Sequence, residues 1–166
     1  EANYNLGTLN LRKNDFRLAR QYLERTIQLR PDYAEAWNNL GMMSAQQGRL
    51  DEAIENFEKS LQLRPGLAIA LLNLGNVYRR QRSFEKAQEY LRQALQLQPD
   101  DPETNYSIGM LYAQEGDVPK ATESLRKALE LRPAYPEALN NLGVLFVRTE
   151  KYAEAEDELK TGIRLA

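Results

Sequence analysis

Glycine recurs at one fixed interval along the whole chain. Each member of the series follows the previous one by 34 residues, without an insertion or deletion, at Gly7, Gly41, Gly75, Gly109 and Gly143. A regular period of this size indicates a stack of small units, each of which buries its apolar face only against its neighbours. The period therefore predicts a single array over residues 1–166, with repeats at 1–33, 34–67, 68–101, 102–135 and 136–166.

Other residue types keep the phase of the glycines. An aliphatic residue precedes each glycine, an alanine stands 12 residues after it, and a large apolar residue stands four residues after the alanine. In the second repeat these are Leu40, Ala53 and Phe57. A proline follows 24 residues after the glycine in the first four repeats, and in the second repeat it is Pro65. Several columns in phase over five copies exclude coincidence.

Each repeat is expected to form two helices. In the second repeat, apolar residues recur at helical spacing over residues 35–47 and 51–63, and Gly48 separates the two patterns. Gly48 suits a left-handed turn after the first helix, and Asp117 suits the N-cap of a second helix. Pro102 stands where a first helical turn would begin, a position that tolerates proline.

The chain resembles the tetratricopeptide repeat family over its whole length. The second repeat carries the resemblance best, through Trp37, Leu40, Gly41, Ala53, Phe57 and Pro65. The resemblance implies an all-α fold, a right-handed α-solenoid of antiparallel helix pairs with a concave groove. Asn3 and Asn105 depart from the pattern, because they stand where the second repeat has Trp37. We expect these two asparagines to weaken packing in the first and fourth repeats.

The resemblance implies that one face of each first helix lines the groove. Rotation by about 100° per residue assigns side chains to that face. The expected peptide-binding residues are Tyr4, Asn5, Asn38, Asn39, Met42, Leu72, Asn73, Asn76, Arg79, Tyr106, Met110, Asn140, Asn141 and Val144. The alternative is that neighbouring first helices bury these side chains against each other.

Asparagine stands two residues before the glycine in four of the five repeats, at Asn5, Asn39, Asn73 and Asn141. This asparagine column resembles the ladder in the repeat arm of O-linked N-acetylglucosamine transferase, which implies side-chain amides that grip the backbone of an extended peptide. An amide suits this role because it offers both donors and an acceptor. The alternative is that each amide bonds to a neighbouring helix, and the sequence leaves both open.

Composition excludes several classes of function. The 22 basic and 24 acidic residues give a net charge of −2, which argues against a nucleic-acid partner. No apolar run approaches the roughly 20 residues of a membrane span, so membrane insertion is not expected. The chain contains no His and no Cys, which removes imidazole bases, thiol nucleophiles and thiolate metal sites. We therefore expect no enzyme, with no catalytic residues, no metal and no cofactor.

The expected function is that of a protein–protein interaction scaffold, which binds an extended peptide or partner segment in the concave groove. The location is unknown, with a soluble, cytoplasmic protein favoured. The chain begins at Glu1 and is interpreted as a fragment of a larger protein. One alternative is a self-assembly module, a homo-oligomer formed through an exposed terminal helix with Leu159, Ile163 and Leu165. Another is the substrate-recognition arm of an enzyme, such as a glycosyltransferase, whose catalytic domain lies outside these residues.

Overall fold

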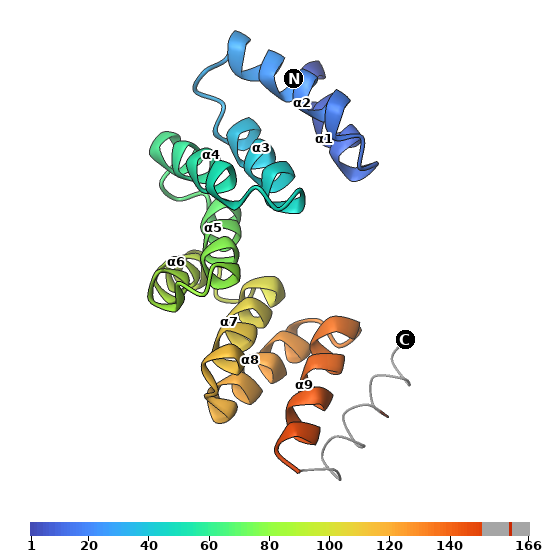
Figure 1. Cartoon of the computed structure of the whole chain (residues 1–166), viewed down its shortest axis with the longest axis vertical. Coiled ribbons are helices and arrows are strands. Elements are labelled where there is room, and N and C mark those ends of the chain that lie inside the picture. Colours follow the sequence, from blue (N-terminus) through green and yellow to red (C-terminus); the bar gives the residue numbers. More distant parts are fainter. Residues whose placement is uncertain (151–159, 161–166) are drawn as a thin grey trace. The chain divides into compact units, whose positions relative to one another are not determined.

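The computed structural model describes residues 1–150 and residue 160, and these residues form helices and no strand (Figure 1). We call the odd-numbered helices the first helices and the even-numbered ones the second helices. Leu159, Ile163 and Leu165, the basis of the self-assembly alternative, lie outside the described residues. The helices are α1 (Ala2–Arg12), α2 (Phe16–Leu29), α3 (Ala34–Gln46), α4 (Leu50–Leu63), α5 (Ala68–Arg80), α6 (Phe84–Leu97), α7 (Pro102–Glu115), α8 (Val118–Leu131) and α9 (Pro136–Arg148).

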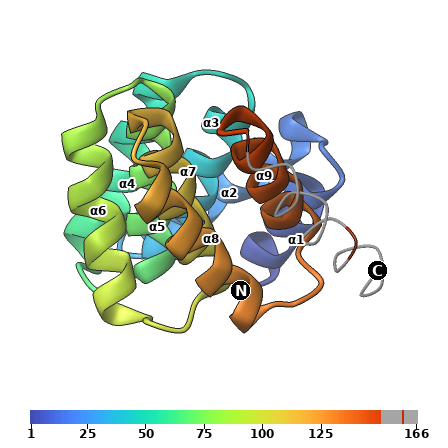
Figure 2. The same ribbon diagram turned by 90° about the horizontal axis from the view of Figure 1, so that it is seen from below.

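The chain divides into two compact parts, an N-terminal part, Glu1–Ser83, and a C-terminal part, Phe84–Ala166. Within each part, the described helices contact only helices one or two places away along the chain. In the C-terminal part, for example, α7 and α8 lie side by side in both ribbon views (Figures 1 and 2). The two predicted helices of the second repeat are confirmed, because α3 and α4 begin and end within one residue of the expected bounds.

The glycine column marks where the two helices of a repeat touch. A Cβ atom added to Gly41 would lie 2.6 Å from Cε1 of Phe57, the apolar residue 16 positions later. The same addition at Gly109 would lie 2.8 Å from Cγ of Leu125. Phe57 is 1% exposed, so its ring is held in the contact between the two helices. The glycine is therefore required because any side chain there would push the helix pair apart.

The turn after each first helix adopts a left-handed conformation. Gly48 has φ 77° and Gly116 has φ 86°, which confirms the expected left-handed turn at Gly48. The same column holds Asn14, Arg82 and Glu150 in the other repeats, and their φ values lie between 58° and 61°. The position in the repeat thus imposes this conformation whatever the side chain. The predicted roles of Asp117 and Pro102 are also confirmed, as the N-cap of α8 and the first residue of α7.

Replacing Gly48 with alanine is expected to lower the free energy of unfolding by about 1 kcal/mol. No atom lies within 4 Å of the added Cβ, so the cost is confined to the left-handed backbone. Gly66 is the matched control, because its added Cβ also meets nothing and its backbone lies outside the left-handed region. Urea unfolding should show that Gly66→Ala is neutral or stabilising, and equal losses for the two variants would contradict the prediction.

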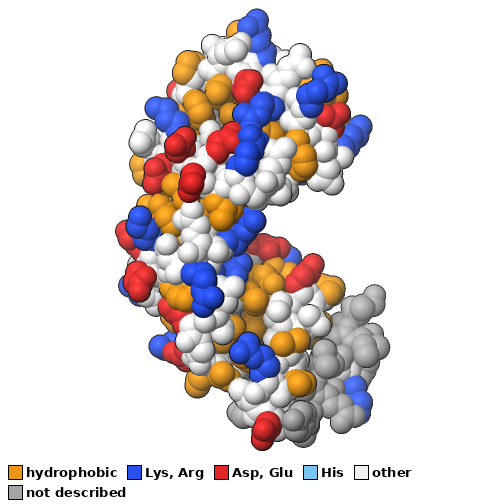
Figure 3. All heavy atoms as spheres, viewed as in Figure 1, with side chains coloured by type: hydrophobic (Ala, Val, Ile, Leu, Met, Phe, Trp, Pro, Cys, Tyr) orange, Lys and Arg blue, Asp and Glu red, His pale blue; other side chains and the backbone are white. Residues whose placement is uncertain are grey.

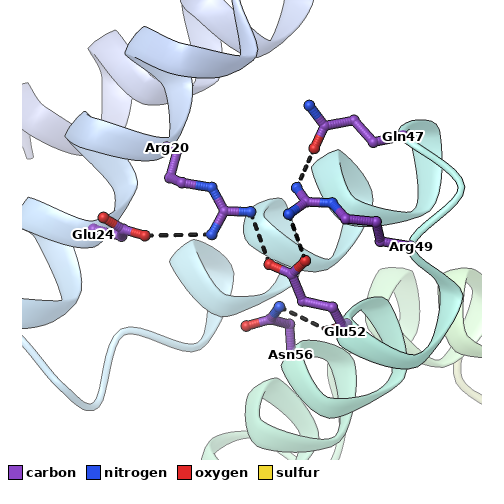
Figure 4. A network of polar contacts seen from close by, with 6 residues as sticks. All are labelled: Arg20, Glu24, Gln47, Arg49, Glu52 and Asn56. Atoms are coloured by element: carbon purple, nitrogen blue, oxygen red, sulfur yellow. Dashed lines mark hydrogen bonds and ion pairs between the residues drawn. The ribbon is translucent and has the colours of Figure 1, made fainter.

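A polar network joins the second helices of the first two repeats (Figure 4). Arg20 of α2 donates to Glu52 of α4 at 2.7 Å, and Glu24 accepts from Arg20 at 3.4 Å. Arg49 reaches the other carboxylate oxygen of Glu52 at 2.8 Å and also contacts Gln47. Partial burial acts to raise the pKa of Glu52, but the hydrogen bond and charge of Arg20 outweigh burial, and the pKa lies below its ordinary value.

This network makes stability depend on pH in the acid range. The pKa of Glu52 is lower in the folded than in the unfolded chain, so its contribution is present above the unfolded pKa and is lost as pH falls through the folded pKa. Glu52→Gln should therefore flatten the decline in melting temperature below about pH 4.5. Glu55→Gln is the control on the same helix, since Glu55 is exposed and makes no ion pair with the described residues. An acid profile unchanged by Glu52→Gln would rule out this contribution.

Candidate protein-binding surface

The face predicted to line the groove is partly buried in the N-terminal part. Asn38, Asn39 and Leu72 are 4%, 7% and 6% exposed. Tyr4 is half-buried and packs edge-on against Tyr33, with ring centroids 5.0 Å apart. Packing between helices therefore buries several side chains that were predicted to contact a peptide. The predicted residues of this part that are not buried are Tyr4, Asn5, Met42, Asn73, Asn76 and Arg79, and of these Asn5 is exposed and the others are half-buried.

The asparagine column bonds from each first helix back to the preceding one. Nδ2 of Asn39 donates to Oγ1 of Thr8 on α1 at 2.9 Å. Nδ2 of Asn73 donates to Oδ1 of Asn38 on α3 at 3.0 Å. In the C-terminal part, Nδ2 of Asn141 donates to the phenol oxygen of Tyr106 at 3.0 Å.

Asn5 makes no such bond among the described residues, and its side chain is exposed. The other members of the column, Asn39, Asn73 and Asn141, thus bond to a neighbouring helix, which was one of the two roles that the sequence left open.

Asn39→Ala is expected to lower the free energy of unfolding by about 1 kcal/mol, because it leaves the Thr8 hydroxyl without its donor in a half-buried site. Asn5→Ala is a control from the same column and should leave stability unchanged. Thermal melts of the two variants should differ by roughly 2–4 °C. Equal melting temperatures would show that the interhelix bond contributes nothing.

A pocket of about 180 Å³ opens between α3 and α5 within the N-terminal part. Its apolar wall includes Met42, Phe57 and Val77, and its polar edge includes Asn73 and Asn76. The volume is smaller than the 300–1,000 Å³ typical of small-molecule sites, and it suits a single side chain. The sequence predicted Met42, Asn73 and Asn76 here but missed Phe57 and Val77, because both belong to the packing pattern of their helices.

Arginine and asparagine side chains hold the edge of this pocket in place. Arg80, which also lines the pocket, donates to the carbonyl oxygen of Ala45 at 2.8 Å. Nε of Arg79 donates to Oδ1 of Asn76 at 3.3 Å. The polar edge is therefore preorganised, which lowers the entropy lost when a ligand orders it.

The predicted residues of the C-terminal part fall into two groups. Tyr106 and Met110 are partly buried and pack against the hydrophobic core of α8 and α9. Asn140 and Val144 of α9 are exposed, and Val144 keeps 48% of its surface accessible. Their side chains thus offer a mixed polar and apolar surface.

Tyr106 belongs to an aromatic and ionic cluster that sequence reasoning missed. Its ring centroid lies 5.1 Å from that of Tyr135, whose hydroxyl donates to Glu103 at 2.5 Å. Arg132 reaches the other oxygen of Glu103 at 2.6 Å. Burial and the bond to Glu103 raise the pKa of Tyr135 far above its ordinary value. The sequence feature that could have predicted this cluster is Tyr135, which follows its repeat glycine by 26 residues. Tyr33 occupies the same position in the first repeat.

Basic and acidic side chains are interspersed over the face shown in Figure 3. In residues 1–150 and 160, no three acidic side chains gather as they would around a metal ion. None of the helices in this range has the length and apolar character of a membrane span.

Family models agree with the repeat pattern along the chain. Models described as tetratricopeptide repeat match residues 1–33, residues 32–100, and residues 72–136 and 106–166. The chain belongs to the tetratricopeptide repeat family. No curated protein sequence matches this tetratricopeptide repeat chain.

Solved structures share the all-α tetratricopeptide repeat solenoid. MamA from Desulfovibrio magneticus RS-1 is 24% identical with a TM-score of 0.82, over 99% of this chain and 93% of that one. PilF of Pseudomonas aeruginosa is 22% identical with a TM-score of 0.89, over 98% and 74%. YrrB, described as a tetratricopeptide repeat protein with an unusual peptide-binding site, is 25% identical with a TM-score of 0.71, over 98% and 84%.

Proposed function

We propose that this chain is a non-catalytic scaffold whose first helices bind an extended segment of a partner protein. Family membership supports this function, because stacked helical repeats present extended surfaces that other proteins contact. The similarity to YrrB, a protein with a peptide-binding site, supports the same kind of ligand.

The pocket between α3 and α5 carries the proposal. An apolar side chain of the partner enters beside Met42, Phe57 and Val77, and hydrophobic burial supplies the affinity. The amides of Asn73 and Asn76 lie at the edge, where they bond to the backbone of the same segment. Neighbouring exposed residues of the first helices, such as Asn5, extend the contact along the N-terminal part.

In the C-terminal part, Asn140 and Val144 are the proposed contacts, because their side chains are accessible. Asn38, Asn39 and Leu72 are left out of the contact surface and support it from within the packed helices. We also propose that residues 1–166 form a single continuous array of repeats.

Selection of peptides displayed on phage against the 166-residue chain tests the function. Fluorescence anisotropy then gives the Kd of each selected peptide for the unaltered chain and for Ala45→Trp, which fills the pocket. We expect a loss of at least tenfold, or about 1.4 kcal/mol. Asn76→Ala should weaken binding as well, whereas Gln62→Ala, on exposed α4 surface, should not.

Circular dichroism must show that each variant keeps its helix content. A failure to select any peptide, or selected peptides whose Kd is the same for Ala45→Trp, would refute the proposed site.

A further inference from the structure

A second cavity lies in the C-terminal part, on the side of α7 that faces the second helices. Its volume is about 480 Å³, within the range of ligand sites, and it is lined by α6, α7 and α8. Leu91 and Leu111 form part of its wall and are almost fully buried. None of the residues assigned to peptide binding lines it.

The cavity is lined by a residue that stands where the second repeat has an aromatic ring. Asn105 lines it and stands two repeats after Trp37, in the same column. In the second repeat, Nε1 of Trp37 donates to the carbonyl oxygen of Pro31 at 3.1 Å. In the fourth, Nδ2 of Asn105 donates to the equivalent carbonyl of Pro99 at 3.3 Å. Asn105 thus reproduces the hydrogen bond of the tryptophan but carries no ring.

The ion pair found at the equivalent place of the N-terminal part is absent between the corresponding residues here. In the N-terminal part, the ion pair of Arg20 and Glu52 bridges α2 and α4 (Figure 4). The equivalent residues on α6 and α8 are Gln88 and Lys120, which cannot form an ion pair. Lys120 instead bonds to Asp117 of its own helix cap at 2.7 Å. Gln88 donates from Nε2 to the phenol oxygen of Tyr112 at 3.4 Å, a neutral hydrogen bond in place of the ion pair of Figure 4.

One acceptor in the cavity wall has no donor among the described residues. Asn105 is 7% exposed, and both of its hydrogen bonds are made by Nδ2, to Pro99 and to the carbonyl oxygen of Asp101 at 2.9 Å. Two carbonyl acceptors identify that atom as the nitrogen, so Oδ1 is the atom without a donor among the described residues. Because Asn105 lines the cavity, this oxygen can accept a hydrogen bond from a ligand that brings an N–H group.

We propose that this cavity binds the indole ring of a tryptophan on a partner polypeptide. The ring fills the space that Trp37 fills for itself in the second repeat, and its N–H donates to Oδ1 of Asn105. Arg92 on α6 and Glu123 on α8 line the cavity and make no ion pair with described residues. Uncharged indole offers no charge that pairs with either residue. A polypeptide with an acidic and a basic residue beside its tryptophan pairs with both.

Calorimetric titration of the 166-residue chain tests the proposal with three probes. N-acetyl-tryptophan amide should bind with a Kd of about 1 mM, and N-acetyl-leucine amide should bind at least tenfold more weakly because it lacks the ring N–H. A peptide with a central tryptophan between glutamate and lysine should bind at least tenfold more tightly than the free amide. Equal affinity of peptide and amide would overturn the polypeptide source and leave a small indole compound as ligand.

Asn105→Trp should abolish binding of all three probes and raise the Tm by about 4 °C, because the chain then fills its own cavity. Asn3→Trp changes the equivalent column of the first repeat and should leave binding unchanged. If Asn105→Trp does not fold, Asn105→Leu replaces it, since Leu71 and Leu139 occupy this column elsewhere. No binding to the unaltered chain, or binding that survives both Asn105 variants, would refute the site. These results are independent of Ala45→Trp, so the two sites can fail separately.

Discussion

Replacing Phe57 with alanine is expected to lower the free energy of unfolding by about 4 kcal/mol, because it removes a buried ring and leaves a cavity. Phe57 is the largest of the fully buried side chains in the described residues, at 1% exposure. It lies in the contact between α3 and α4, against Gly41. The Tm should fall by roughly 8–16 °C for a chain of this size.

Trp37 provides the measurement for Phe57→Ala. It is the only tryptophan of the chain and lies in the same repeat as Phe57, so its fluorescence reports unfolding of that repeat. Glu55→Ala, at an exposed position of the same helix, is the control and should change the unfolding free energy by less than about 0.5 kcal/mol. A loss below about 1.5 kcal/mol for Phe57→Ala would contradict the tight contact between the two helices.

Gly41→Ala is expected to cost about 2 kcal/mol, the second largest effect. The new Cβ would lie 2.6 Å from the ring of Phe57, and this overlap outweighs the better helix propensity of alanine. Gly109→Ala should cost less, because it meets the flexible Leu125 at 2.8 Å rather than a rigid ring. Urea unfolding, followed by Trp37 fluorescence and circular dichroism, gives the free energy of unfolding of the unaltered chain, Gly41→Ala and Gly109→Ala.

A double-mutant cycle decides whether the ring is the cause of that cost. In the Phe57→Ala background the overlap is gone, so Gly41→Ala should become neutral or stabilising by up to about 1 kcal/mol. The coupling energy should therefore reach about 2–3 kcal/mol. Additive losses would show that Gly41→Ala acts through something other than Phe57.

The repeat fold was predictable because its signals are spaced along the sequence. The contact between Gly41 and Phe57 follows from two columns in phase, and the turn at Gly48 follows from its residue type. The left-handed conformation of Arg82 was not predictable from its side chain, since only its place in the repeat reveals it. The expected weak packing around Asn105 stays a prediction, and the cavity that this residue lines could not be located from its column alone.

The candidate surface was harder to predict, because helical rotation alone cannot tell a groove from an interhelix contact. Asn39 and Asn73 occupy the same position of their repeats as Asn5, and within the described residues they bond to a preceding first helix whereas Asn5 does not. Whether an asparagine amide bonds to a neighbouring helix depends on the distance to that helix, and this distance cannot be read from the sequence pattern. For the same reason, the burial of Leu72 could not be separated from exposure.

The restriction of contacts to near neighbours within each part has a consequence for synthesis on the ribosome. At 5–20 residues per second, a 34-residue repeat emerges in roughly 2–7 s. Helical units with local contacts fold in microseconds to milliseconds, far faster than the next repeat appears. A nascent chain can therefore pack α1 and α2 before α4 is made, so the growing end keeps about one repeat of apolar surface open to chaperones at a time.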